Sequence, residues 1–114
     1  MAVNSRQKGA RGERYVAAKF REYGYDAHRT AQFRGNTGQA ADVEGIPGIH
    51  AEVKFQETLR LQDWLDQAKR DAAKAGDGLP TVFHKKNNAE LLVTMEFSTW
   101  IQLYREWESG RGER

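Results

Sequence analysis

Two carboxylates and a lysine stand close together in the stretch AADVEGIPGIHAEVKFQ, which runs from Ala40 to Gln56. Asp42 precedes a turn-forming segment, and Glu52 and Lys54 follow that segment with one residue between them. Carboxylate oxygens are ligands that Mg²⁺ prefers, and water and a substrate phosphate can complete its octahedral shell. A lysine there would place a compact positive charge near an attacking water or the developing charge on phosphorus. These residue types therefore permit metal-assisted chemistry on a phosphate.

Alternation along a strand decides which of these side chains meet. The apolar set that would form a buried face is Ile49, Ala51, Val53 and Phe55. The opposite face would then carry His50, Glu52, Lys54 and Gln56. The pattern Glu-x-Lys alone fits better a half-buried strand whose outer face carries a weak ion pair. A lone strand histidine is usually a satisfied surface or core residue, so neither His50 nor His84 is assigned to a site.

The register of the hairpin determines whether Asp42 joins this group. A two-residue turn at Pro47 and Gly48 would place Asp42 opposite Val53, on the core side. A shared metal site therefore requires a bulge or an odd-length loop, and Gly45 is its predicted position.

An earlier carboxylate, Glu13, lies in the segment RGERYVAAKFREYG, where apolar residues recur at helical spacing. Helical periodicity puts Glu13 on the same side as Val16, Ala17 and Phe20, and Gly24 suits the position just past the helix end. Two interpretations remain open. Glu13 belongs to the same site as Asp42, or it lies in the first helical turn, where the helix dipole favours an acid.

The elements that must position these residues follow from the pattern of the whole chain. Helical spacing recurs over residues 11–24, 59–76 and 97–107. Strand patterns lie at 25–35, 41–46, 49–55, 79–86 and 89–95. The predicted order is helix, three strands, helix, two strands, helix, which is a mixed α/β fold. We expect one domain over residues 1–108 and a disordered tail over 109–114.

Composition limits the kinds of protein this chain can be. Its 114 residues, 39% of them hydrophobic, suit one compact domain. There is no cysteine, which excludes disulfides, a zinc ribbon and a thiol nucleophile. Neither a membrane span nor the apolar segment of a secretory signal is visible, so we expect a cytoplasmic, intracellular protein.

Charge is distributed unevenly. Residues 1–34 hold eight Lys or Arg against three acids, whereas residues 35–114 hold ten against thirteen. A basic segment ahead of an acidic remainder fits a polyanion partner such as DNA. It fits a solvated helix face and a loose basic tail equally well.

The combined motifs resemble the PD-(D/E)XK nuclease superfamily. They are Glu13 in GARGER, Asp42 in AADVEG, and Glu52 with Lys54 in HAEVK. The first helix, KGARGERYVAAKFREYGY, is most similar to archaeal-type Holliday junction resolvases and their phage relatives. Two positions depart from the family pattern. Ala41 replaces the proline before the aspartate, and the loop GNTG offers only Thr37 in place of a frequent serine.

The resemblance implies a restriction-endonuclease-like core and roles for individual residues. Asp42, Glu52 and Glu13 would bind Mg²⁺, with Mn²⁺ able to substitute, and Lys54 would orient water or stabilise the transition state. Gln67 resembles a glutamine that related nucleases place near the site, although a helix-surface amide is the simpler interpretation. The implied reaction is hydrolysis of a DNA phosphodiester.

The implied partner is DNA, branched or as a four-way junction. Candidate contacts to it are Lys8, Arg11, Arg14, Arg29, Arg34, Thr37, Lys85 and Lys86. Two alternatives remain, namely a flap, nicking or restriction-type nuclease of the same superfamily and a noncatalytic nucleic-acid-binding module.

A junction has two symmetry-related strands to cut, so a resolvase should be a twofold homodimer. The last helix carries an aromatic stripe that could serve it. We expect Trp100 and Ile101 to cover the sheet, and Tyr104 and Trp107 to form the interface.

Overall fold

The computed structural model describes residues 5–30 and 40–112, with side chains from residue 9 onward. Its elements are α1 (Ser5–Glu22), β1 (His28–Arg29), β2 (Val43–Glu44), β3 (Ile49–Phe55), α2 (Leu61–Ala75), β4 (Leu79–Lys85), β5 (Leu92–Thr94) and α3 (Phe97–Gly112). The predicted order and the α/β class are confirmed. Two predicted DNA contacts, Arg34 and Thr37, lie outside the described residues, as does the side chain of Lys8.

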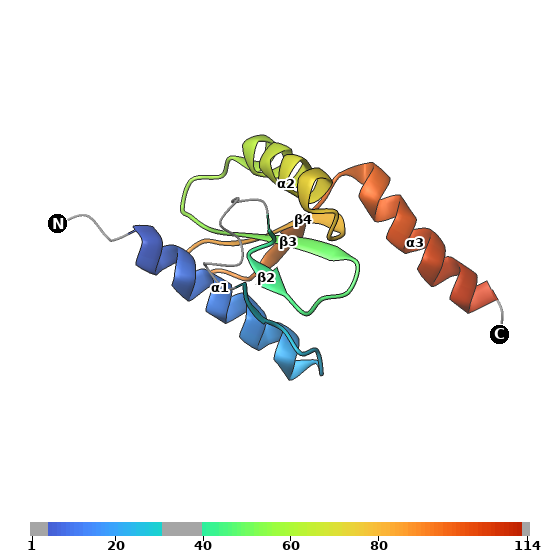
Figure 1. The fold of residues 1–114 in the computed structure, drawn as a ribbon, viewed down its shortest axis with the longest axis horizontal. Helices are drawn as coiled ribbons and strands as arrows, with labels where there is room; N and C mark the ends of the chain where they lie inside the picture. The colour runs from blue at the N-terminus through green and yellow to red at the C-terminus, as the bar shows by residue number, and fades with distance from the viewer. Residues whose placement is uncertain (1–4, 31–39, 113–114) are drawn as a thin grey trace.

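The strands form one sheet in the order β1-β2-β3-β4-β5. Only β3 and β4 run parallel, and α2 makes the crossover that joins them. The helices α1 and α2 lie on opposite sides of the sheet (Figure 1). The central strand β3 is therefore covered on both faces, and its residues 50–53 are buried.

The α1 side of the sheet carries the larger apolar core. Its buried members are Val16, Ala17, Ala27, Val43, Ala51, Val53 and Phe83. Helix α1 packs closely on β3 at Gly12, where an added Cβ would lie 2.9 Å from Cγ of Phe55. A glycine at this position lets the helix approach β3, so the next residue, Glu13, lies beside the end of that strand.

The face of the sheet on the α2 side is buried. The sequence pattern of β3 had suggested that this face is polar and exposed to solvent. Trp64, Ala68 and Val82 form a second apolar cluster there. His50 and Glu52 lie on this side of the sheet with exposed fractions of 0% and 2%. The simple half-buried strand is thus wrong for β3, because α2 covers the face that carries its charged residues.

Helix α3 extends away from the sheet (Figure 1). It carries stacked rings along one side, with Trp100 and Tyr104 centroids 5.0 Å apart and Tyr104 and Trp107 centroids 5.6 Å apart. The expectation that Trp100 covers the sheet is wrong, because 47% of its surface is exposed.

The end of the chain also differs from the sequence prediction. The helix continues to Gly112, so residues 109–112 are helical rather than irregular. One local cause is the Arg111 guanidinium, which lies over the Trp107 ring, 4.8 Å from its centroid and one helical turn away. No helix in residues 5–30 and 40–112 is long and apolar enough to cross a membrane.

Candidate active site

The turn between β2 and β3 brings Asp42 close to Glu52. Val43 pairs with Ala51, so an odd number of residues separates the paired positions. The odd-length loop that a shared site requires is therefore confirmed. The Asp42 N–H also donates to the Ala51 carbonyl at 2.9 Å, so Asp42 and Val43 both face Ala51, as in a β-bulge.

Gly45, the predicted position of the irregularity, shapes the loop rather than the bulge. Its φ is +94°, and a Cβ there would lie 2.1 Å from the carbonyl oxygen of Asp26. Only glycine accommodates both that backbone angle and that close approach.

The side chains predicted to be catalytic line a single cleft of about 380 Å³. They are Glu13 from α1, Asp42 before β2, Glu52 and Lys54 from β3, and Gln67 from α2. Strand alternation places Glu52 and Lys54 on the α2 face, and the hairpin register adds Asp42. Three carboxylates and an amine therefore meet where the two helices flank β3.

Burial and neighbouring acids shift the pKa of Asp42. Burial is the larger cause, and together with repulsion from Glu52 and Glu13 it raises this pKa to about 8. The Val53 N–H, which donates to Asp42 Oδ2 at 2.9 Å, and the positive charge of Lys54 act in the opposite direction. A buried carboxylate beside other acids resists ionisation. A bound divalent cation would offset this repulsion and favour the ionised form.

Lys54 is hydrogen-bonded to Gln67 on α2, the glutamine that the family resemblance implies near the site. Its Nζ donates to Oε1 of Gln67 at 3.0 Å. The amide is therefore more than a helix-surface group, because it fixes the position of the ammonium in the cleft.

Glu13 is tied to the sheet by an arginine. Arg29 Nε donates to Glu13 Oε1 at 2.8 Å, and the two side chains are only 27% and 20% exposed. The structure thus places Arg29, predicted as a DNA contact, against an acid of the cleft. Glu13 lines the cleft, and because α1 begins at Ser5, the alternative that Glu13 lies in the first helical turn is wrong.

Two residues next to the cleft were missed in the sequence. His50 Nδ1 lies 2.7 Å from Asp77 Oδ1, and its Nε2 lies 3.1 Å from Glu52 Oε1. Burial lowers the pKa of His50, but its hydrogen bonds to Glu52 and Asp77 outweigh that effect and leave the pKa raised. Strand alternation already put His50 on the face of Glu52, whereas nothing local marks Asp77, which is 27 residues away.

A further acid, Asp71 on α2, also approaches Glu52. The ligand-capable atoms of His50, Glu52 and Asp71 lie within 4.8 Å of one another. The other strand histidine, His84, is a satisfied core residue whose Nε2 lies 2.7 Å from Thr94 Oγ1. Burial lowers the pKa of His84.

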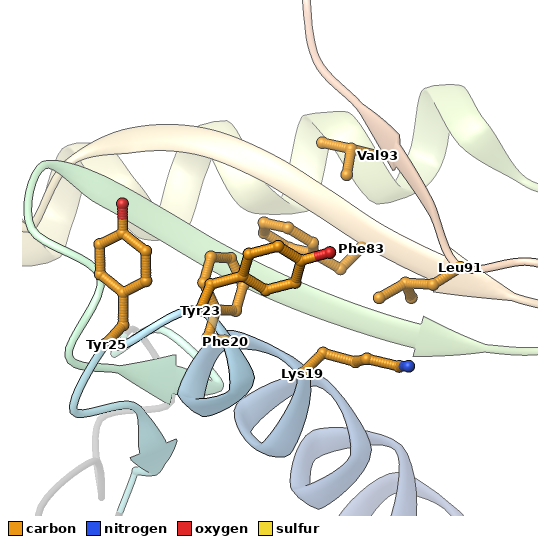
Figure 2. A pocket seen from close by; sticks show the side chains of 7 residues that line it. All are labelled: Lys19, Phe20, Tyr23, Tyr25, Phe83, Leu91 and Val93. Atoms are coloured by element: carbon orange, nitrogen blue, oxygen red, sulfur yellow. The ribbon is translucent and has the colours of Figure 1, made fainter.

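A second hollow, of about 270 Å³, has a different character. It lies between the end of α1 and strands β4 and β5, and its walls are aromatic and aliphatic (Figure 2). Its lining residues are Lys19, Phe20, Tyr23, Tyr25, Phe83, Leu91 and Val93. Because no carboxylate is among them, the acidic cleft is the better candidate for metal chemistry.

Four further basic side chains predicted to contact DNA lie within the described residues. Arg11 and Arg14 are exposed on α1, and Lys86 is exposed after β4. Lys85 Nζ lies 5.9 Å from the ring centroid of Phe55, which lines the cleft. Lys85 therefore lies near the cleft, and all four cations stay predicted contacts to a DNA backbone.

Comparison with known proteins agrees with this geometry. A family model described as "Phage putative PDDEXK endonuclease" matches residues 4–111. Among solved structures, the chain is similar to Hjc of Archaeoglobus fulgidus, a Holliday junction resolvase from an archaeal hyperthermophile, with a TM-score of 0.56 and 26% identity. That match covers 77% of this chain and 72% of the archaeal one. No curated protein sequence matches the chain.

Proposed function

Because the chain belongs to the family of phage PDDEXK endonucleases, we propose that it is a Mg²⁺-dependent endonuclease that resolves Holliday junctions. The observation that carries the proposal is the convergence of Glu13, Asp42, Glu52 and Lys54 in one cleft. They come from α1 and from both arms of the hairpin, and no packing requirement explains why three acids should meet there.

The donor set fits a hard divalent cation. Asp42 and Glu52 would hold Mg²⁺ directly, with Glu13 as a further ligand or as an acceptor for a bound water. The raised pKa of Asp42 supports this assignment, since it marks a buried acid with too little positive charge nearby. When bound, the cation would supply charge stabilisation to the phosphate oxygens. Mn²⁺ has the same ligand preference and should substitute.

Lys54, positioned by Gln67, would orient the attacking water and stabilise the charge that develops on the phosphate. The Gln67 carbonyl oxygen accepts one hydrogen of the Lys54 ammonium, which leaves two for other acceptors. In the cleft these acceptors would be the attacking water and a nonbridging phosphate oxygen. Water attack forms the new P–O bond while the water loses a proton to solvent, the bond to the leaving sugar oxygen breaks, and that oxygen takes up a proton from solvent.

Contacts to the DNA backbone would come from the cations beside the cleft. We assign this role to Arg11, Arg14, Lys85 and Lys86, and extend it to Lys8, Arg34 and Thr37 on sequence grounds. Arg29 would act mainly through Glu13, because its guanidinium is already paired.

A preference for four-way junctions is supported by the similarity to the archaeal resolvase.

Two symmetry-related cuts require two centres, so we propose a twofold homodimer. The exposed aromatic stripe of α3 is the candidate interface, since Trp107 keeps 54% of its surface exposed on a helix that projects from the body. Light scattering at micromolar concentration should give a dimer. A monomer with and without junction DNA would instead favour a nicking or flap nuclease.

One cleavage experiment tests the proposal. Four-way junction, flap and linear duplex of matched sequence would be incubated with Mg²⁺, Mn²⁺ or EDTA. We expect metal-dependent cleavage that is fastest on the junction, and loss of cleavage but not of DNA binding in Asp42→Asn. Binding that survives EDTA without cleavage of any substrate would indicate a noncatalytic nucleic-acid-binding module.

A further inference from the structure

A buried histidine lies between two carboxylates behind the cleft. His50 is fully buried, and its two ring nitrogens lie 2.7 Å from Asp77 Oδ1 and 3.1 Å from Glu52 Oε1. The same face of the sheet carries an apolar cluster that includes Trp64 and Val82. A valine or leucine would pack there without the desolvation cost of a buried polar chain, so stability alone does not explain the histidine.

Asp77 links the hydrogen bonds of His50 on β3 to the segment just before β2. Its Oδ1 bonds to His50, and its Oδ2 accepts the backbone N–H of Ala41 at 3.2 Å. Ala41 directly precedes Asp42, and His50 bonds to Glu52. A single carboxylate after α2 is therefore tied to both segments that carry the proposed metal ligands.

We propose that Asp77 and His50 are positioning residues that hold Glu52 and the segment bearing Asp42 at the separation a shared cation needs. The inference rests on the proposed metal-dependent function. A hydrogen bond from His50 to Glu52 Oε1 would leave Oε2 as the oxygen that ligates the cation. Outer hydrogen bonds of this kind fix the orientation of a ligating carboxylate, and their loss typically weakens metal binding or activity about 10- to 100-fold.

Direct metal binding tests this role without relying on catalysis. The dissociation constant for Mn²⁺ would be measured by calorimetry on the wild type, His50→Leu and Asp77→Ala. We expect both variants to bind Mn²⁺ about 10- to 100-fold more weakly. At saturating Mn²⁺ we expect a lower kcat on junction DNA with little change in KM, because neither residue is in the surface proposed to contact DNA.

His84→Leu is the matched control. His84 is also a buried strand histidine on the α2 side, but its partner is Thr94 rather than an acid of the cleft. The variant His84→Leu should change the melting temperature about as much as His50→Leu does, and it should leave the affinity for Mn²⁺ unchanged. Asp77 is 33% exposed in its side chain, so Asp77→Ala remains informative even where His50→Leu fails to fold.

Coupling between the two residues gives a second readout. Asp77 acts on Glu52 through His50 and on the Asp42 segment through the Ala41 N–H. Asp77→Ala should therefore weaken Mn²⁺ binding in the His50→Leu background, but by a smaller factor than it does in the wild type. Asp77→Asn keeps an acceptor oxygen and should restore part of the affinity lost in Asp77→Ala.

The outcomes separate this inference from the proposed function. Wild-type cleavage and Mn²⁺ binding, with unchanged affinity in both His50→Leu and Asp77→Ala, would overturn the positioning role alone. A wild type that neither binds Mn²⁺ nor cleaves any DNA would overturn both.

Discussion

Asp42 should make the metal-free protein less stable as the pH rises. Its pKa is raised from 3.8 to about 8, first by burial and then by the charge of Glu52. Between these values the folded chain retains a proton that the unfolded chain has released. The contribution of protonated Asp42 to the free energy of unfolding is therefore fully present below pH 3.8, and it is lost as the pH rises through about 8.

The size of this effect follows from the shift. One pKa unit corresponds to about 1.4 kcal/mol, so the loss between pH 5 and pH 8 reaches at most about 4 kcal/mol. Asp42→Asn cannot ionise and should remove about 2 to 4 kcal/mol of that loss. The variant should retain a smaller slope of the same sign, because the raised pKa of His50 also makes stability fall with pH.

Urea unfolding in EDTA at several pH values between 5 and 8 would measure the effect. Glu106→Gln, an exposed substitution on α3, is the control for loss of one acid and should follow the wild type. At pH 8, Mn²⁺ at about 100 times its dissociation constant should stabilise the wild type by about 2.7 kcal/mol, and Asp42→Asn far less. Parallel pH profiles of wild type and Asp42→Asn in EDTA would refute the reasoning.

Three further predictions concern the site and the assembly. Glu52→Gln and Lys54→Ala should fold with near-normal melting temperatures but lose cleavage, while Glu13→Gln should lose only about 10- to 100-fold; retained activity in the first two would place the chemistry elsewhere. Gly12→Ala should reduce the free energy of unfolding by about 1 to 2 kcal/mol through its contact with Phe55, whereas Gly9→Ala, with open space around it, should not; urea curves that match for the two would contradict the close packing. Trp107→Glu should convert the dimer to a monomer in light scattering and slow paired cutting of junctions, and an unchanged dimer would exclude α3 as the interface.

The sequence by itself determined much of the fold and the chemical composition of the site. Helical and strand periodicity are local properties, so the element order could be predicted from the chain alone. Alternation on β3 likewise put His50, Glu52 and Lys54 on one face before any partner was known. The motifs around Glu13 and Asp42 supplied the other two acids, and the absence of cysteine restricted any metal to oxygen or imidazole ligands.

Tertiary structure decided how these residues are used. The odd-length turn and the bulge at Asp42 brought that acid into the cleft beside Glu52, and a turn prediction from Pro47 and Gly48 alone would have placed it on the other face. Packing of α2 over β3 buried the polar face and delivered Gln67 to Lys54. Asp77 reaches His50 across 27 residues. Such pairings depend on which elements become neighbours, and a hydrogen bond between distant residues leaves no periodic trace in the sequence.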